Sequence, residues 1–188
     1  MMNRREALSR VALIMGGTVL GAEAFLSGCT TGKTGLSFSA TDITFLNEVA
    51  ETILPATSTP GAKEAKVGEF MTVIVKDCYE EKDQNTFVEG LKKLNEASTK
   101  ANGKTFVEAT AAQRHDLLVG LDKEASAFQK TKKPEEQKHY FTMLKELTLW
   151  GFFSSEVGAT KVLRYNAVPG KYDGSYPYKK GDKAWATS

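Results

Sequence analysis

Apolar residues recur at helical spacing in five stretches of this chain. The clearest stretch is residues 67–78, where apolar side chains fall on one helical face at i, i+3, i+4, i+7, i+8 and i+11. These side chains are Val67, Phe70, Met71, Ile74, Val75 and Cys78. No part of the chain alternates strictly between apolar and polar residues, which is the pattern of a half-buried strand. The pattern therefore predicts a mainly α fold, a compact helical domain of about five helices.

The other four helices are predicted from their ends as well as their apolar faces. The first begins near Ser39 or Thr41, either of which is a good N-cap, and Pro55 ends it. The fourth starts near Thr110, and the fifth has Pro134 in its first turn, a position that proline favours. The four apolar faces are formed by Ile43, Leu46, Val49, Ala50 and Ile53; by Phe87, Val88, Leu91 and Leu94; by Leu117, Leu118 and Leu121; and by Tyr140, Phe141, Leu144, Leu147 and Trp150, running on toward Phe153.

The C-terminal segment, residues 156–188, differs in kind from the helices. Its aromatic residues Tyr165, Tyr172, Tyr176, Tyr178 and Trp185 are interrupted by Pro169, Gly170, Gly174, Pro177 and Gly181. This spacing of proline and glycine excludes a regular helix, yet the segment is too aromatic for a solvated tail. Tyr and Trp are common interface anchors. The segment either wraps its own domain or lies against another protein, and the pattern leaves both open.

Residues 1–28 are typical of an export signal peptide. Arg4, Arg5 and Arg10 form a basic flank, and the apolar run Val11–Gly21 follows. A transmembrane helix needs about 20 apolar residues. This run is shorter and rich in glycine, so we expect a cleaved signal rather than a membrane span.

The signal ends in Leu26-Ser27-Gly28-Cys29, the order expected of a lipoprotein-processing site. We predict that the Cys29 thiol is lipidated, because it follows an aliphatic residue and two small residues after the apolar run. Acyl chains in combination hold a protein on a membrane stably. Residues 29–38 are then a flexible tether. Residues 39–188 form the helical domain, including the C-terminal segment.

Arg4 and Arg5 also resemble the start of a twin-arginine export motif, with Leu8 in the expected place but Ala7 where phenylalanine is commoner. An ordinary secretory leader with two adjacent arginines is the alternative. The twin-arginine route carries folded proteins, usually because a cofactor was inserted in the cytoplasm. A partner that contains the cofactor and has no signal of its own would explain such a route.

Charge and composition offer little catalytic chemistry. The formal net charge is +2, with no basic arm and no interleaving of arginine with aromatic residues, which argues against nucleic acid as a partner. The two histidines, His115 and His139, have no recognisable metal-ligand partners. No phosphate-binding loop or nucleophile motif is present. We therefore predict no catalytic, cofactor-binding or metal site in this chain.

Three stretches resemble the gluconate 2-dehydrogenase subunit 3 family. They are ETILPATSTPGAKEAKVGEF from Glu51, FFSSEVGATKVLRYNAVPGKYDG from Phe152, and KKGDKAW ending at Trp185. The resemblance covers the chain from about Phe38 to Trp185. It implies that the chain is the small subunit of a periplasmic oxidoreductase complex and is not catalytic itself. The large subunit would be a flavoprotein of the glucose–methanol–choline oxidoreductase class that holds FAD, and a cytochrome c with its haem often accepts the electrons.

By the same resemblance, the chain would bind the large subunit, support its export and maturation, and anchor it on the periplasmic side of a membrane. Thr30 after the lipidated cysteine is compatible with the outer membrane. The partner-binding residues expected on this hypothesis are Pro55, Pro60, Gly61, Tyr165, Tyr172, Tyr176 and Trp185. The alternative from another class is a free-standing periplasmic lipoprotein that binds carbohydrate through aromatic residues.

Overall fold

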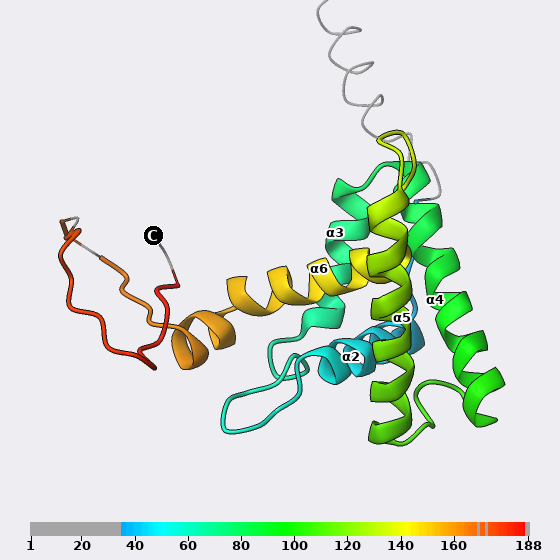
Figure 1. Cartoon of the computed structure of the whole chain (residues 1–188), viewed down its shortest axis with the longest axis horizontal. Coiled ribbons are helices and arrows are strands. Elements are labelled where there is room, and N and C mark those ends of the chain that lie inside the picture. Colours follow the sequence, from blue (N-terminus) through cyan, green and yellow to red (C-terminus); the bar gives the residue numbers. More distant parts are fainter. Residues whose placement is uncertain (1–34, 169, 172, 187–188) are drawn as a thin grey trace, which may run out of the picture. The chain divides into compact units, whose positions relative to one another are not determined.

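The computed structural model describes residues 35–168, 170–171 and 173–186. The chain divides into two units, residues 1–36 and 37–188, and all the helices described lie in the second. They are α2 (Ala40–Ile53), α3 (Val67–Cys78), α4 (Glu81–Asn102), α5 (Ala111–Thr131), α6 (Tyr140–Ser154) and the π-helical turn η1 (Gly158–Val162) (Figure 1). These residues contain no strand beyond one isolated bridge. The predicted mainly α fold is confirmed.

The predicted helix starts near Ser39 or Thr41 and near Thr110 are also confirmed, because Ser39 and Thr110 each cap their helix through a capping box. The Ser39 hydroxyl accepts the Asp42 N–H at 3.2 Å, and the Asp42 carboxylate accepts the Ser39 N–H at 2.8 Å. Thr110 and Gln113 exchange the same pair of bonds at the start of α5. Such capping boxes are local in sequence, which is why the pattern could place these helix starts.

The predicted start of the fifth helix is wrong. Pro134 lies in an exposed turn, and α6 begins only at Tyr140. The cap is His139, whose Nδ1 accepts the Phe141 N–H at 3.2 Å. Tyr140 packs so closely on α4 that a Cβ at Gly90 would lie 2.4 Å from the Tyr140 Cβ. Packing between helices therefore sets this start, and the local preference of proline for a first turn does not.

The core is organised around α6, which contacts each of α2, α3, α4 and α5 (Figure 1). The largest fully buried apolar side chains come from α2, α3, α4 and α6 itself, and from the loop between α4 and α5. They are Leu46 and Val49; Val67, Met71 and Val75; Phe87 and Leu94; Phe106; and Leu144 and Leu147. None of the helices in the described part of the chain is long and apolar enough to cross a membrane.

Candidate functional site

The loop between α2 and α3, residues 54–66, is bound at two backbone N–H groups by one carboxylate of α2. Glu51 Oε1 accepts the Ala56 N–H and Oε2 accepts the Lys63 N–H, both at 2.9 Å. Gly61 lies against the same carboxylate, since a Cβ there would be 2.4 Å from Oε1 and 2.6 Å from the Ala56 nitrogen. Only glycine fits at this point, so Gly61 shapes the loop.

A second glutamate ties this loop to α5. Glu48 forms ion pairs with Lys63 of the loop and with Arg114 of α5. Burial of Glu48 opposes its ionisation, but the hydrogen bonds from Lys63 and Arg114 outweigh burial and hold the pKa of this carboxyl below its ordinary value. Pro55 at the start of the loop is exposed and Pro60 is half-buried. The loop is thus a rigid feature that leaves Pro55 at its surface.

The loop is also joined to the end of α6 through η1. Lys161 Nζ of η1 lies 2.6 Å from Glu64 Oε1 of the loop. The turn before η1 depends on Ser155, whose hydroxyl accepts the Gly158 N–H at 3.0 Å, and on Gly158 itself. A Cβ at Gly158 would lie 2.0 Å from the Phe152 carbonyl oxygen. The two stretches that carry the strongest family resemblance therefore meet in the fold.

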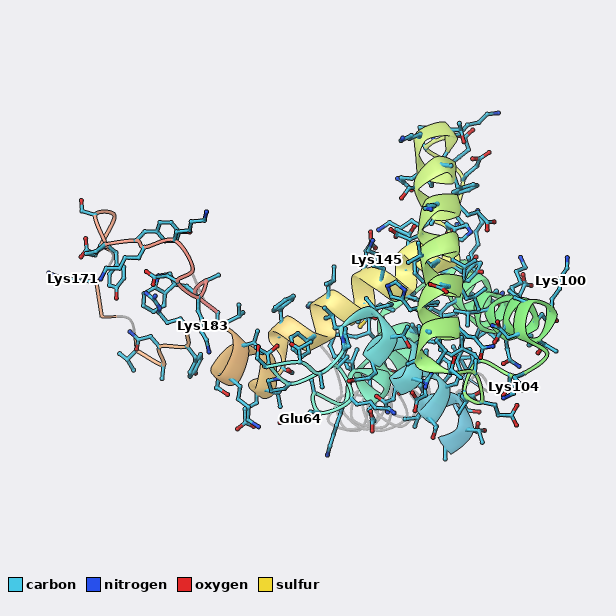
Figure 2. All side chains as sticks on the ribbon, turned by 60° about the horizontal axis from the view of Figure 1, so that its bottom comes forward. Glu64, Lys100, Lys104, Lys145, Lys171 and Lys183 are labelled. Atoms are coloured by element: carbon cyan, nitrogen blue, oxygen red, sulfur yellow. The ribbon has the colours of Figure 1, made fainter. Side chains whose placement is uncertain are left out.

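The C-terminal segment closes on itself through Arg164. The Arg164 N–H donates to the Ala184 carbonyl and the Ala186 N–H donates to the Arg164 carbonyl, both at 2.8 Å. These bonds make the parallel bridge between Arg164 and Trp185. Figure 2 draws the side chains of the segment, with Lys171 and Lys183 labelled.

Side chains reinforce this closure. The Arg164 guanidinium carbon lies 4.6 Å from the Trp185 ring centroid and 5.5 Å from the Tyr176 centroid. The two rings meet edge to face at 5.4 Å, and Asp182 lies 3.8 Å from the guanidinium. The structure therefore brings together Tyr176 and Trp185, two of the predicted partner-binding residues, around a cation that sequence reasoning did not single out.

The aromatic rings of the segment remain exposed despite this ordering. The exposed fraction is 51% for Tyr165, 51% for Tyr176, 77% for Tyr178 and 44% for Trp185. The described part of the segment thus folds on itself and does not bury these rings against the helices. Between residues 164 and 185 it carries five basic and two acidic residues, so it presents a basic as well as an aromatic surface.

Some predicted site residues lie outside the described part of the chain. They are Arg4, Arg5, Cys29 and Tyr172.

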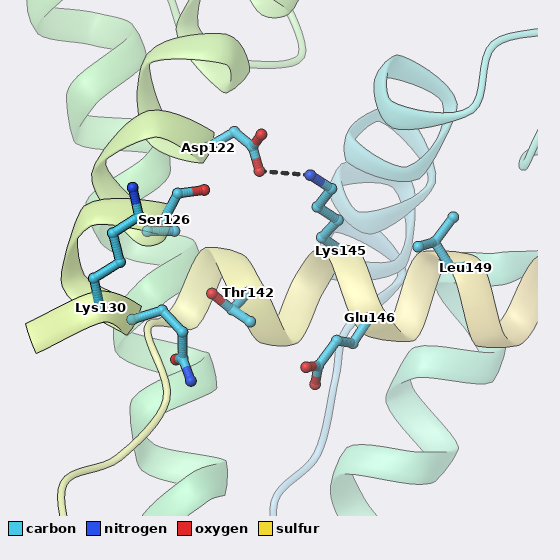
Figure 3. Close-up of a pocket in the computed structure, with 9 residues that line it drawn as sticks. Asp122, Ser126, Lys130, Thr142, Lys145, Glu146 and Leu149 are labelled. Atoms are coloured by element: carbon cyan, nitrogen blue, oxygen red, sulfur yellow. Dashed lines mark hydrogen bonds and ion pairs between the residues drawn. The ribbon is translucent and has the colours of Figure 1, made fainter. Parts of the chain in front are cut away.

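A groove open to solvent runs between α5 and α6 (Figure 3). Asp122 Oδ1 and Lys145 Nζ form an ion pair across it at 2.6 Å. The other lining residues mix apolar and polar side chains: Ala125, Ser126, Gln129, Lys130, Thr142, Glu146 and Leu149. The arrangement offers no nucleophile with a neighbouring base. Among the residues described, no three His, Cys, Asp or Glu side chains gather as a metal site would require.

The two histidines differ in their surroundings. His115 is exposed, with Nδ1 3.4 Å from the Asp116 carboxylate. His139 is half-buried, and its Nε2 lies 3.7 Å from Glu124 Oε1. Burial lowers the pKa of the His139 imidazole below its ordinary value, although Glu124 acts in the opposite sense. A neutral imidazole suits the capping role, because Nδ1 must be unprotonated to accept the Phe141 N–H.

Comparison with known proteins identifies one family. Residues 40–170 match the family model described as gluconate 2-dehydrogenase subunit 3. No curated protein and no solved structure matches the chain significantly.

Proposed function

Because the chain belongs to the gluconate 2-dehydrogenase subunit 3 family, we propose that it is the non-catalytic small subunit of an FAD-dependent sugar or sugar-acid dehydrogenase. Family membership implies a partner dehydrogenase complex. In this proposal the chain binds the flavoprotein large subunit of that complex, supports its export and maturation, and anchors it to a membrane. FAD belongs to the large subunit, and a cytochrome c receives the electrons.

The observation that carries the proposal is the cluster in which the exposed rings of Tyr176 and Trp185 pack around the half-buried Arg164. Ordering a flexible surface costs free energy on binding, and a surface that is already ordered avoids part of this cost. Here the parallel bridge and the stacked guanidinium hold both rings in place before any partner arrives. Tyr, Trp and Arg are also the residue types that dominate binding energy at protein interfaces.

The loop 54–66 supports the same proposal. Glu51 and Gly61 shape the loop, and the Glu64–Lys161 ion pair links it to η1 at the start of the C-terminal segment. A rigid loop next to an ordered aromatic segment makes a composite surface. Pro55 and Pro60 contribute stiffness to that surface, since proline restricts the backbone.

Carbohydrate binding by the isolated chain is the weaker alternative. A sugar would stack on a free aromatic face. The Arg164 guanidinium already occupies one face of the Trp185 ring, and the Tyr176 ring contacts the Trp185 ring edge to face. The lipid anchor at Cys29 and the export signal at Arg4 and Arg5 are common to both readings. They do not discriminate between them.

Co-expression with the flavoprotein large subunit tests the proposal. Wild type and the Arg4→Lys/Arg5→Lys variant are compared for flavin absorbance in the periplasmic and membrane fractions. We expect the flavoprotein to appear there only with the wild-type chain, and a Cys29→Ser variant to move it from the membrane to the soluble periplasmic fraction. Export of the flavoprotein without this chain would exclude the escort role. Sugar binding by the chain alone would favour the alternative.

A further inference from the structure

The last turns of helix α6, after Lys145 and Glu146, are uncharged around their whole circumference, but the rest of the chain covers only part of them. Residues 147–155 contain no charged side chain. Seven residues of the helix are buried: Phe141, Met143, Leu144, Leu147, Thr148, Gly151 and Phe152. In the same last turns, Trp150 is 53% exposed and Phe153 is 39% exposed. A helix that is apolar on all sides is normally buried on all sides. One side of these last turns of α6, at Trp150 and Phe153, therefore lacks its cover.

Helix α3 extends this uncovered side. The Phe70 ring meets the Trp150 ring edge to face at 5.2 Å. It also lies directly against the α6 backbone, since a Cβ at Gly151 would be 2.6 Å from Phe70 Cδ1. Val73, one turn further along α3, is 55% exposed. Phe70, Val73, Trp150 and Phe153 form what we name the α3/α6 apolar face, and the edge-to-face contact between the Phe70 and Trp150 rings joins its two helices.

We infer that the α3/α6 apolar face is a second docking site for the flavoprotein large subunit, an inference that rests on the proposed function. The helices that carry the face are joined along the chain to both parts of the proposed contact surface. The loop 54–66 enters α3 at Val67, three residues before Phe70. Helix α6 leads into η1 at the start of the C-terminal segment, and the Glu64–Lys161 ion pair connects that loop to η1. A partner that binds the loop and the segment therefore borders this face.

The chemistry of the two regions defines what the large subunit presents. Opposite the α3/α6 apolar face it presents an uncharged apolar surface, because a charge buried there would find no partner among residues 147–155. Residues 164–185 have an excess of positive charge, with five basic and two acidic residues. Opposite this part of the C-terminal segment the large subunit therefore presents acidic side chains.

A lipid surface fits the face less well. Helices that lie on membrane surfaces carry lysine and arginine beside their apolar side. The last turns of α6 carry neither, and on α3 only Lys76 is basic. The lipid anchor predicted at Cys29 supplies membrane attachment without this face.

The test compares charged variants of exposed positions. The full-length chain is co-expressed with a tagged flavoprotein large subunit, and the small subunit retained on the tag is quantified. We expect Val73→Lys and Trp150→Lys each to reduce retention at least about tenfold, because a lysine would be buried without a partner. The matched control is Val119→Lys on α5, whose side chain is 39% exposed and lies outside the face; it should retain wild-type binding. Unchanged thermal unfolding of Val73→Lys establishes that the loss is not caused by misfolding.

The outcomes separate this inference from the proposed function. If both lysine variants are retained like wild type while Trp185→Ala is lost, the inference is overturned and the proposed function stands. If the wild-type chain is not retained at all, the proposed function fails. The inference is also overturned if gel filtration shows a homodimer that Val73→Lys abolishes, because a second copy of the chain would then cover the face. It is overturned equally if the Cys29→Ser chain, which lacks the lipid anchor, binds vesicles of phosphatidylethanolamine and phosphatidylglycerol and Trp150→Lys abolishes this binding. The face would then contact lipid.

Discussion

The Arg164 guanidinium stacks on the Trp185 ring, with 4.6 Å between the guanidinium carbon and the ring centroid, and the backbones of the same two residues form a parallel bridge. Twenty residues of irregular chain are thereby closed into a loop by one side chain and two backbone hydrogen bonds. This pair joins the two ends of the described part of the segment, in which the rings of Tyr165, Tyr176 and Tyr178 are more than half exposed.

Replacing Arg164 should therefore loosen the segment. A cation–π contact at an exposed site contributes about 0.5–1 kcal/mol, and Arg164 makes two. We expect Arg164→Ala to raise the rate of proteolysis between residues 165 and 185 about fivefold or more while the melting temperature of the helices stays unchanged. Arg164→Lys should be intermediate, since it keeps the charge but loses the planar stack. Lys180→Ala is the control, and proteolysis as slow in Arg164→Ala as in this control would contradict the assignment.

Gly61 is predicted to tolerate no side chain. A Cβ there would lie 2.4 Å from Glu51 Oε1 and 2.6 Å from the Ala56 nitrogen, so Gly61→Ala must displace the hydrogen bonds that shape the loop. We expect a loss of about 1–3 kcal/mol in the free energy of unfolding, measured by urea denaturation. Gly120→Ala provides the contrast, because its Cβ would meet nothing within 4 Å inside α5. That variant should be more stable than wild type by up to about 1 kcal/mol.

The ion pairs of Glu48 should contribute measurably to stability. Side chains of Glu48 and Arg114 are 17% and 18% exposed, so solvent screens their interaction only in part. We expect Glu48→Gln to cost about 1.5–3 kcal/mol in urea denaturation, the range for hydrogen bonds to charged groups. Asp122→Asn, at an ion pair that is 43–45% exposed, should cost at most about 1 kcal/mol. Equal costs for the two variants would show that burial does not strengthen the Glu48 network.

His139 should make stability fall as the solution becomes acidic. Its pKa is lowered in the folded chain, mainly by burial, so the unfolded chain binds the proton more readily. The stabilisation is complete above the ordinary imidazole pKa of 6.5 and is lost as the pH falls below it. Protonation also removes the lone pair with which Nδ1 caps α6.

The measurement is the free energy of unfolding between about pH 5 and 7.5, a range that brackets the ordinary histidine pKa. His139→Asn keeps a capping acceptor that cannot titrate, so it should flatten the dependence on pH. His115→Asn, at an exposed position, should leave the dependence as it is in wild type. If the free energy of unfolding of His139→Asn depends on pH as steeply as that of wild type, groups other than His139 cause the dependence.

Most of the helical framework was predictable because its signals are local. Val67–Cys78 is bounded as its apolar periodicity predicts, and Ser39 and Thr110 cap their helices with partners three residues away. The predicted helix start at Pro134 was wrong because the actual start depends on a contact between distant residues. Helix α6 begins where Tyr140 packs on Gly90 of another helix, and no local pattern around residue 134 contains that contact.

The candidate site was predictable in its parts but not in its construction. Pro55, Pro60 and Gly61 stood out as a loop, and Tyr176 and Trp185 as interface aromatics. Glu51, which holds the loop, and Arg164, which holds the aromatic rings, are ordinary charged residues in the printed sequence. Their roles depend on partners as distant as Lys63 and Trp185, so periodicity could not reveal them.

The amino-acid sequence by itself determined which segments are helical and which family the chain belongs to, because capping, periodicity and family motifs are carried by neighbouring residues. Only the tertiary structure decided which apolar side chains are covered. Leu147 and Trp150 stand one turn apart in the same apolar run, yet one is fully buried and the other is half exposed. The physical reason is that burial depends on which helices pack against α6, and these helices come from distant parts of the chain.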